Sequence, residues 1–130
     1  LIVTSKRFVI LQHDTPIGHE RPRHWDLMLE DDQGTLQTWA MAESPADGSR
    51  IFADALPPHR LEYLDYEGPI SGNQGHVSRL FAGEFVWEPS GERTLRFVVD
   101  GEMVTWRLRI TCTGDATWCE FVDVKHLATD

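Results

Sequence analysis

Lysine is almost missing from this 130-residue chain: Lys6 and Lys125 are the only two, and the rest of its 12 basic residues are arginines. Against 21 acidic residues this leaves a formal net charge of -9 at pH 7. Sequence-independent binding of nucleic acid draws on many cations that meet phosphates, so the composition argues against a broad electrostatic grip on DNA or RNA. A local phosphate pocket built from arginines remains open, because the guanidinium suits bidentate phosphate contacts.

Long apolar runs are also absent. The longest cover only a few residues, far short of the roughly 20 that cross a bilayer, so we expect no membrane-spanning segment. The start, Leu1-Ile2-Val3 followed by Thr-Ser-Lys-Arg, lacks the basic-then-apolar order of a signal peptide, which favours a cytoplasmic protein.

Cysteine is scarce too, since Cys112 and Cys119 are the only two. Two cysteines exclude a zinc quartet and a disulfide framework. A hairpin around residues 113–118 would bring the two thiols opposite each other, but two reduced, partly buried thiols are the favoured alternative.

What the chain does contain is typical of one packed domain, residues 1–130, with 41% hydrophobic residues. Turn-forming pairs such as Asp100-Gly101 separate short runs rich in β-branched and aromatic residues, and helical periodicity is nearly absent. We therefore predict an all-β fold, a small antiparallel β-barrel with short helical turns, with a sandwich as the alternative. The expected strands cover residues 7–12, 24–30, 35–41, 50–55, 83–87, 94–99, 103–110 and 118–124.

Two connections carry their own expectations. Pro57-Pro58 is predicted to break the fourth strand and to put His59 on an exposed connection, ahead of one short helical turn at residues 61–65. The glycines from Gly68 to Gly75 predict a flexible or tightly turning loop, and without a following helix they do not form a phosphate-binding P-loop.

The stretch from His24 to Glu30 alternates apolar and polar residues with period two. As a strand it presents one packing face and places His24 and Asp26 side by side on the other face, which is left for chemistry. This spacing suits two ligands of one metal ion or a histidine with an orienting carboxylate, and it is also an ordinary polar edge of a sheet. With His13, at the end of the preceding strand, the pair makes a two-histidine, one-carboxylate set that suits manganese, iron or zinc. We expect the set at the mouth of the barrel.

His59, Tyr63 and Arg50 are the remaining candidates, as residues that supply a proton or hold a phosphate. Each has a plainer alternative: a solvated histidine, a core tyrosine and a surface arginine, just as Asp26 could simply pair with an arginine. The other histidines have no partner pattern and stay unassigned.

Five segments occur in the order, and mostly with the spacing, of the 3′-phosphoesterase domain of bacterial DNA ligase D. They are residues 7–13 (RFVILQH), 24–30 (HWDLMLE), 36–40 (LQTWA), 59–63 (HRLEY) and 64–68 (LDYEG). The chain resembles this family over most of its length. The resemblance implies a compact β-barrel that uses manganese, or another divalent metal such as zinc, to trim 3′ ends of DNA or RNA-tipped primers. Terminal ribonucleotides and 3′-phosphates would be removed before ligation, with separate ligase and polymerase repair proteins as candidate partners.

The resemblance also implies residue roles. His13, His24 and Asp26 match the metal ligands, His59 and Tyr63 match the phosphate-side residues, and Arg50 matches the phosphate-binding arginine. The interval between His13 and His24 is longer than in the family, which leaves His19 as an alternative first imidazole.

Met28 departs from the family, which has an arginine two residues after the metal-binding aspartate. Losing a charge-assisted contact in a dry site costs about 2 to 4 kcal/mol of transition-state stabilisation, unless Arg23, Arg60 or Arg79 moves in. Replacing Met28 with arginine is therefore expected to raise activity. Two further hypotheses stay open: a non-catalytic module that binds metal and a phosphorylated end, and a β-barrel that binds a small ligand without nucleic acid.

Overall fold

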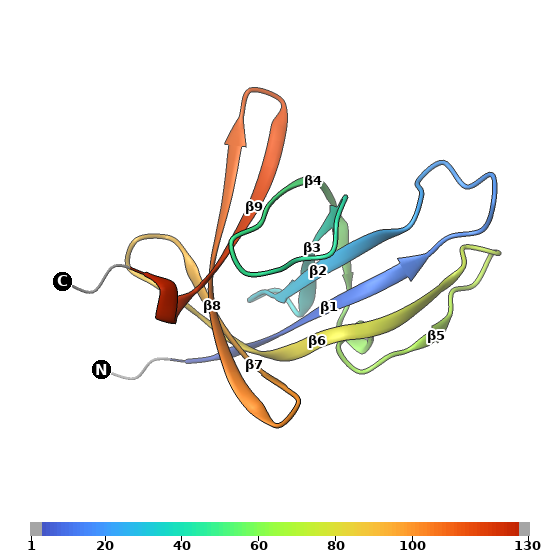
Figure 1. Cartoon of the computed structure of the whole chain (residues 1–130). Helices are drawn as coiled ribbons and strands as arrows, with labels where there is room; N and C mark the ends of the chain where they lie inside the picture. Colours follow the sequence, from blue (N-terminus) through green and yellow to red (C-terminus); the bar gives the residue numbers. More distant parts are fainter. Residues whose placement is uncertain (1–3, 128–130) are drawn as a thin grey trace.

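The computed structural model describes residues 4–127 and shows an all-β chain (Figure 1). Its strands are β1 (Lys6–Asp14), β2 (His24–Glu30), β3 (Thr35–Met41), β4 (Arg50–Arg60), β5 (Gly68–Pro69), β6 (His76–Trp87), β7 (Arg93–Val99), β8 (Glu102–Thr113) and β9 (Ala116–Asp123). Within the described residues the helical pieces are two 3₁₀ turns, η1 (Leu61–Leu64) and η2 (Val124–His126). The expectation drawn from Leu1 to Val3 lies outside the described residues.

Every strand pairs antiparallel, in the order β1-β2-β3-β4-β9-β8-β7-β6-β5, and β1 also pairs with β6. The pairing of β1 with β6 closes eight strands into a barrel and leaves β5 as an extra strand on β6. Closure satisfies backbone groups that an open sheet would leave at its edges. The predicted antiparallel barrel is confirmed, and so is the short helical turn after β4.

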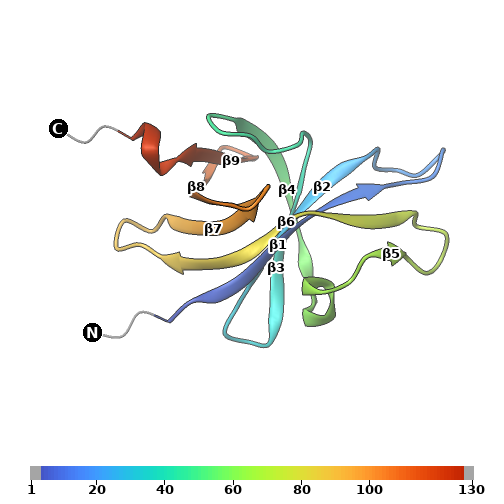
Figure 2. The same cartoon turned by 60° about the horizontal axis from the view of Figure 1, so that its bottom comes forward.

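The barrel wall is packed on both of its faces. Inward side chains from strands all round the barrel form the main core, which includes Phe8, Leu27, Phe97, Trp106 and Phe121. Outward side chains of β1, β2, β3 and β6 form a second, outer core together with η1. Its buried members are Val9, Leu11, Met28, Leu36, Leu64 and Val77. Figure 2 shows the chain that leads from η1 to β5 lying to one side of the barrel, with β5 next to β6.

Pro57 and Pro58 do not break β4, so this prediction was wrong. They lie in the half of β4 that pairs with β3 alone, because the pairing with β9 ends at Ala53. On that free edge a missing N–H costs no ladder hydrogen bond, and the register shifts next to the prolines, between Leu36 and Thr38. His59 therefore belongs to β4 rather than to an exposed connection.

The outward face of β2 is also not reserved for chemistry. Met28 is only 1% exposed and packs in the outer core, so part of this face is a packing surface. An arginine at position 28 would have to bury its charge there, which removes the expectation that Met28→Arg raises activity.

The structure also tests the expectations about the two cysteines and about membrane-spanning segments. Cys112 and Cys119 are free thiols, but Cys112 is exposed, and the register of β8 with β9 opposes it to Thr117 instead of Cys119. Burial raises the pKa of the Cys119 thiol to about 12. Between residues 4 and 127, no helix has the length and apolar character needed to cross a membrane.

Candidate metal centre

Pairing of β1 with β2 places His13 directly opposite His24 and Leu11 opposite Asp26. All three polar side chains face outward, because His24 and Asp26 alternate along β2 with residues that pack inside the barrel. One ring nitrogen of each histidine and one oxygen of Asp26 lie within 4.8 Å of one another. The three predicted residues thus meet, on the outer wall of the barrel and not at its mouth.

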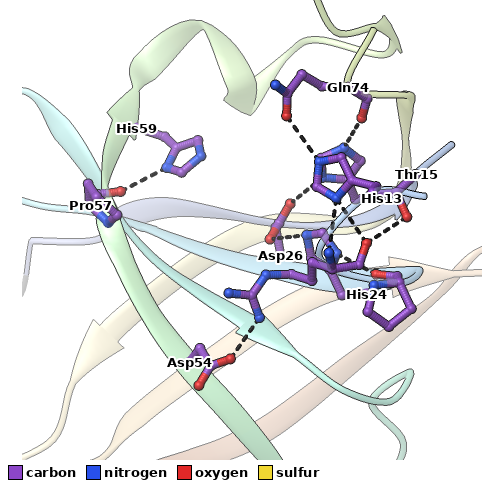
Figure 3. A network of polar contacts seen from close by, with 11 residues as sticks. His13, Thr15, His24, Asp26, Asp54, Pro57, His59 and Gln74 are labelled. Carbon is purple, nitrogen blue, oxygen red and sulfur yellow. Dashed lines mark hydrogen bonds and ion pairs between the residues drawn. The ribbon is translucent and has the colours of Figure 1, made fainter. Parts of the chain in front are cut away.

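Backbone carbonyls determine which ring nitrogens carry hydrogen. His13 Nε2 lies 2.8 Å from the carbonyl oxygen of Gln74, and His24 Nδ1 lies 3.0 Å from that of Pro22 (Figure 3). A carbonyl oxygen can only accept, so both of these nitrogens donate. In the neutral rings, His13 Nδ1 and His24 Nε2 are then left with lone pairs, which is the arrangement that metal-ligating histidines adopt.

Both lone pairs face the carboxylate of Asp26. His13 Nδ1 lies 3.3 Å from Asp26 Oδ2, and His24 Nε2 lies 3.2 Å from Oδ1. Despite that short separation, Oδ1 is buried and receives no hydrogen bond. Three acceptors that face one another at this range require a positive charge between them, either a proton on an imidazole or a metal ion.

The ionisation equilibria reflect this crowding. Hydrogen bonding to Asp26 raises the pKa of His13 above its ordinary value, although burial opposes the shift. Burial disfavours the charged form of Asp26, but contact with His13 and His24 outweighs it and lowers the pKa of the carboxyl. The Asp26 carboxylate therefore stays ionised at neutral pH, and a proton on His13 and a metal ion would compete for the place beside it.

These donors fit a divalent transition metal. Two imidazole nitrogens and one carboxylate oxygen suit manganese, iron or zinc and leave coordination positions free. The side chains of His13, His24 and Asp26 are only 14%, 7% and 4% exposed, so water competes weakly for them.

The connection between β1 and β2, residues 15–23, leads from one side of the cluster to the other and is held by contacts with β4 and with Gln74. Arg21 forms an ion pair of 2.7 Å with Asp54 on β4. His19 accepts a hydrogen bond from the backbone N–H of Arg21 at Nδ1 and donates from Nε2 to the side-chain oxygen of Gln74, at 3.1 Å in both cases. His19 is thus engaged in holding loops together, while His13 contributes the imidazole next to Asp26.

His59 and Tyr63 lie on the same outer side of the barrel. Figure 3 shows His59 on β4, across from His13 and Asp26. Its Nδ1 donates to the carbonyl oxygen of Pro57 at 2.9 Å, which leaves Nε2 as the available nitrogen. The rings of His59 and Tyr63 meet edge to face with centroids 5.7 Å apart, and Tyr63 packs against the outer core.

Arg50 is engaged elsewhere. Its guanidinium lies 4.0 Å from the ring centre of Trp118 and 3.1 Å from a carboxylate oxygen of Glu120, and both partners are on β9. Arg23 and Arg60, two of the arginines considered as substitutes, pair with Asp14 and Glu62. Arg79, the third, donates to the carbonyl oxygen of Leu64 at 3.4 Å and forms no ion pair with the described residues.

Sequence reasoning missed four residues around the cluster, namely Gln74, Pro22, Arg21 and Asp54, and considered His19 only as an alternative imidazole. Gln74 and Pro22 act through backbone carbonyls, so their side-chain identities carry no signal for this role. The glycines around Gln74 were a partial signal, since they marked an unusual turn without indicating what it contacts.

No protein-family model and no curated protein matches this chain. The resemblance to the ligase D phosphoesterase domain therefore stays a prediction, which depends on the five short segments described above.

Proposed function

We propose that this protein is a metal-dependent phosphoesterase that processes 3′ ends of DNA or RNA, removing a terminal ribonucleotide or a 3′-phosphate. The observation that carries the proposal is the Asp26 carboxylate between two imidazole lone pairs, with its Oδ1 buried and without a hydrogen-bond partner. Hydrogen bonds to carbonyls orient both rings, which is the usual support of a metal ligand. The order of the matching segments supplies the substrate class.

In this proposal His13, His24 and Asp26 hold manganese or zinc. A divalent cation supplies Lewis acidity towards a phosphoryl oxygen and lowers the pKa of bound water. When its ring is protonated, His59 would donate from Nε2, and Tyr63 from its hydroxyl, to phosphate oxygens or to the leaving oxygen. The acidic surface restricts binding to the end of a strand, because a long duplex would meet net repulsion.

The test uses purified protein with Mn²⁺ on two primers, one with a single 3′-ribonucleotide and one with a 3′-phosphate. We expect release of the terminal group by wild type and none by His24→Ala, with calorimetry showing that His24→Ala has also lost metal binding. His126→Ala is the matched control, since His126 pairs with Asp47 outside the cluster. His59→Ala and Tyr63→Phe should slow turnover and leave metal affinity unchanged.

A second candidate is a non-catalytic module that binds metal and a phosphorylated end. Burial of Met28, together with the ion pairs of Arg21, Arg23 and Arg60, favours it, because few guanidinium groups are available to a phosphate. Mn²⁺ binding by wild type with both primers left intact selects this function. Wild type that binds neither metal nor oligonucleotide rules out both candidates and leaves a barrel for a small ligand.

A further inference from the structure

The turn from Gly72 to Gly75 meets the metal centre through its backbone. The carbonyl oxygen of Gln74 accepts the hydrogen bond from His13 Nε2 at 2.8 Å. That single contact decides which nitrogen of His13 faces Asp26, because a ring that donates from Nε2 keeps its lone pair on Nδ1 when neutral.

Gly75 holds this carbonyl in place. Its φ of +89° belongs to the left-handed region, and a Cβ built on it would lie 1.8 Å from the backbone oxygen of Asp14. The turn is thus seated directly on the end of β1, one residue beyond His13. Ile70 closes it by donating its N–H to the Gly75 oxygen at 2.8 Å.

The side chain of Gln74 makes a separate contact. Its Oε1 accepts from His19 Nε2 at 3.1 Å and so joins the turn to the connection between β1 and β2 (Figure 3). The backbone and the side chain of one residue therefore have different partners, and substitutions can separate them.

We infer that the Gly72–Gly75 turn is the positioning element of the metal centre: seated by Gly75, the Gln74 carbonyl selects the His13 tautomer that presents Nδ1 to the ion. Gln74 acts on the ion only through His13. The inference rests on the proposed metal site, but the tautomer itself exists without metal and can be measured alone.

The experiment compares Gly75→Ala with Gly72→Ala. Gly72 has a similar φ of +76°, and a Cβ there would meet only the flexible side chain of Gln74, no closer than 3.8 Å. Both variants carry the same left-handed strain, so a difference between them reports displacement of the carbonyl. Gln74→Ala is the second control, because it keeps the carbonyl and removes only the link to His19.

Calorimetric titration with Mn²⁺ and with Zn²⁺ should show an affinity about 10- to 100-fold lower in Gly75→Ala, the usual loss when a supporting contact of a ligand is removed. Gly72→Ala and Gln74→Ala should stay near wild type. Long-range ¹⁵N–¹H spectra of the metal-free proteins, above the titration of the histidines, should place hydrogen on Nε2 of His13 in wild type and in both controls, and on a mixture of nitrogens in Gly75→Ala.

A wild-type spectrum with hydrogen on Nδ1 of His13 overturns the inference without any variant, so it can be refuted even if Gly75→Ala does not fold. Folded Gly75→Ala with wild-type affinity and tautomer overturns it as well. Wild type that binds no metal but keeps hydrogen on Nε2 refutes the proposed function and the role of the turn in metal binding, and leaves only the selection of the His13 tautomer standing.

Discussion

Replacing Asp26 by asparagine separates the contribution of the carboxylate to metal affinity from its effect on the stability of the metal-free fold. Asparagine keeps the shape of the side chain but exchanges one acceptor oxygen for an NH₂ donor. That donor can reach the lone pair of His13 or His24, whose nitrogens lie 3.3 and 3.2 Å from the present oxygens. We predict that Asp26→Asn loses metal binding and, without metal, is more stable than wild type above the titration of His13.

The expected gain follows from the buried acceptor that the substitution satisfies. Relieving one unsatisfied buried polar group is worth about 1 to 3 kcal/mol. For a domain of this size, about 4 °C of melting temperature corresponds to each kcal/mol, so the melting temperature should rise by about 4 to 12 °C.

At lower pH the effect of Asp26→Asn on stability should change from a gain to a loss. Because folding raises the pKa of His13, its ion pair with Asp26 contributes stability that is fully present below the ordinary value of 6.5 and is lost as pH rises through the raised value. Asparagine cannot form this pair, so Asp26→Asn should be less stable than wild type at the acid end and more stable at the alkaline end.

Thermal melts in chelator at both ends of this range, and in Mn²⁺, provide the assay. Metal at 100 times its dissociation constant should stabilise wild type by about 2.7 kcal/mol and leave Asp26→Asn unchanged. Asp54→Asn, an outward carboxylate that pairs with Arg21, is the control that should keep the metal response. A lower melting temperature of Asp26→Asn at the alkaline end in chelator would refute the reasoning, since it would mean that the carboxylate is already satisfied.

Three further predictions concern the same wall of the barrel. In chelator, the free energy of unfolding of wild type should fall as pH rises through the raised pKa of His13, and urea titrations should show that His13→Gln flattens this fall. The Met28 side chain is 1% exposed in the outer core, so Met28→Arg should destabilise the fold by about 3 kcal/mol or more in chemical denaturation. Met28→Leu should destabilise it by less than about 1.5 kcal/mol. An active and fully stable Met28→Arg protein would contradict this prediction. Leu64→Ala should lower the free energy of unfolding by about 2 to 5 kcal/mol, because Leu64 packs η1 against the outer core. Leu61 is 37% exposed, so Leu61→Ala should lower it much less. Equal losses would show that η1 is not held by Leu64.

Local pattern was enough to predict much of the fold. Alternation from His24 to Glu30 predicted β2 with its observed bounds, and glycine- or aspartate-containing turns marked most hairpins. It failed at Pro57 and Pro58, because whether a missing N–H matters depends on which strand lies alongside, and β9 has already ended there. Met28 was misjudged for a related reason: the period of two tells which face a residue is on, but not that η1 covers that face.

For the candidate site, the residue types and their alternation alone determined that His24 and Asp26 share one face of a strand, since this follows from backbone geometry within a few residues. Only the tertiary structure decided that His13 lies opposite His24, that the cluster is on the outer wall, and that the carbonyls of Gln74 and Pro22 orient the two rings. Register between strands and contacts made by backbone atoms arise when distant segments pack together. Every residue has the same backbone carbonyl, so the sequence does not directly indicate which carbonyl makes a given contact. It gives only indirect signals, such as Gly75, which allows the turn to contact β1.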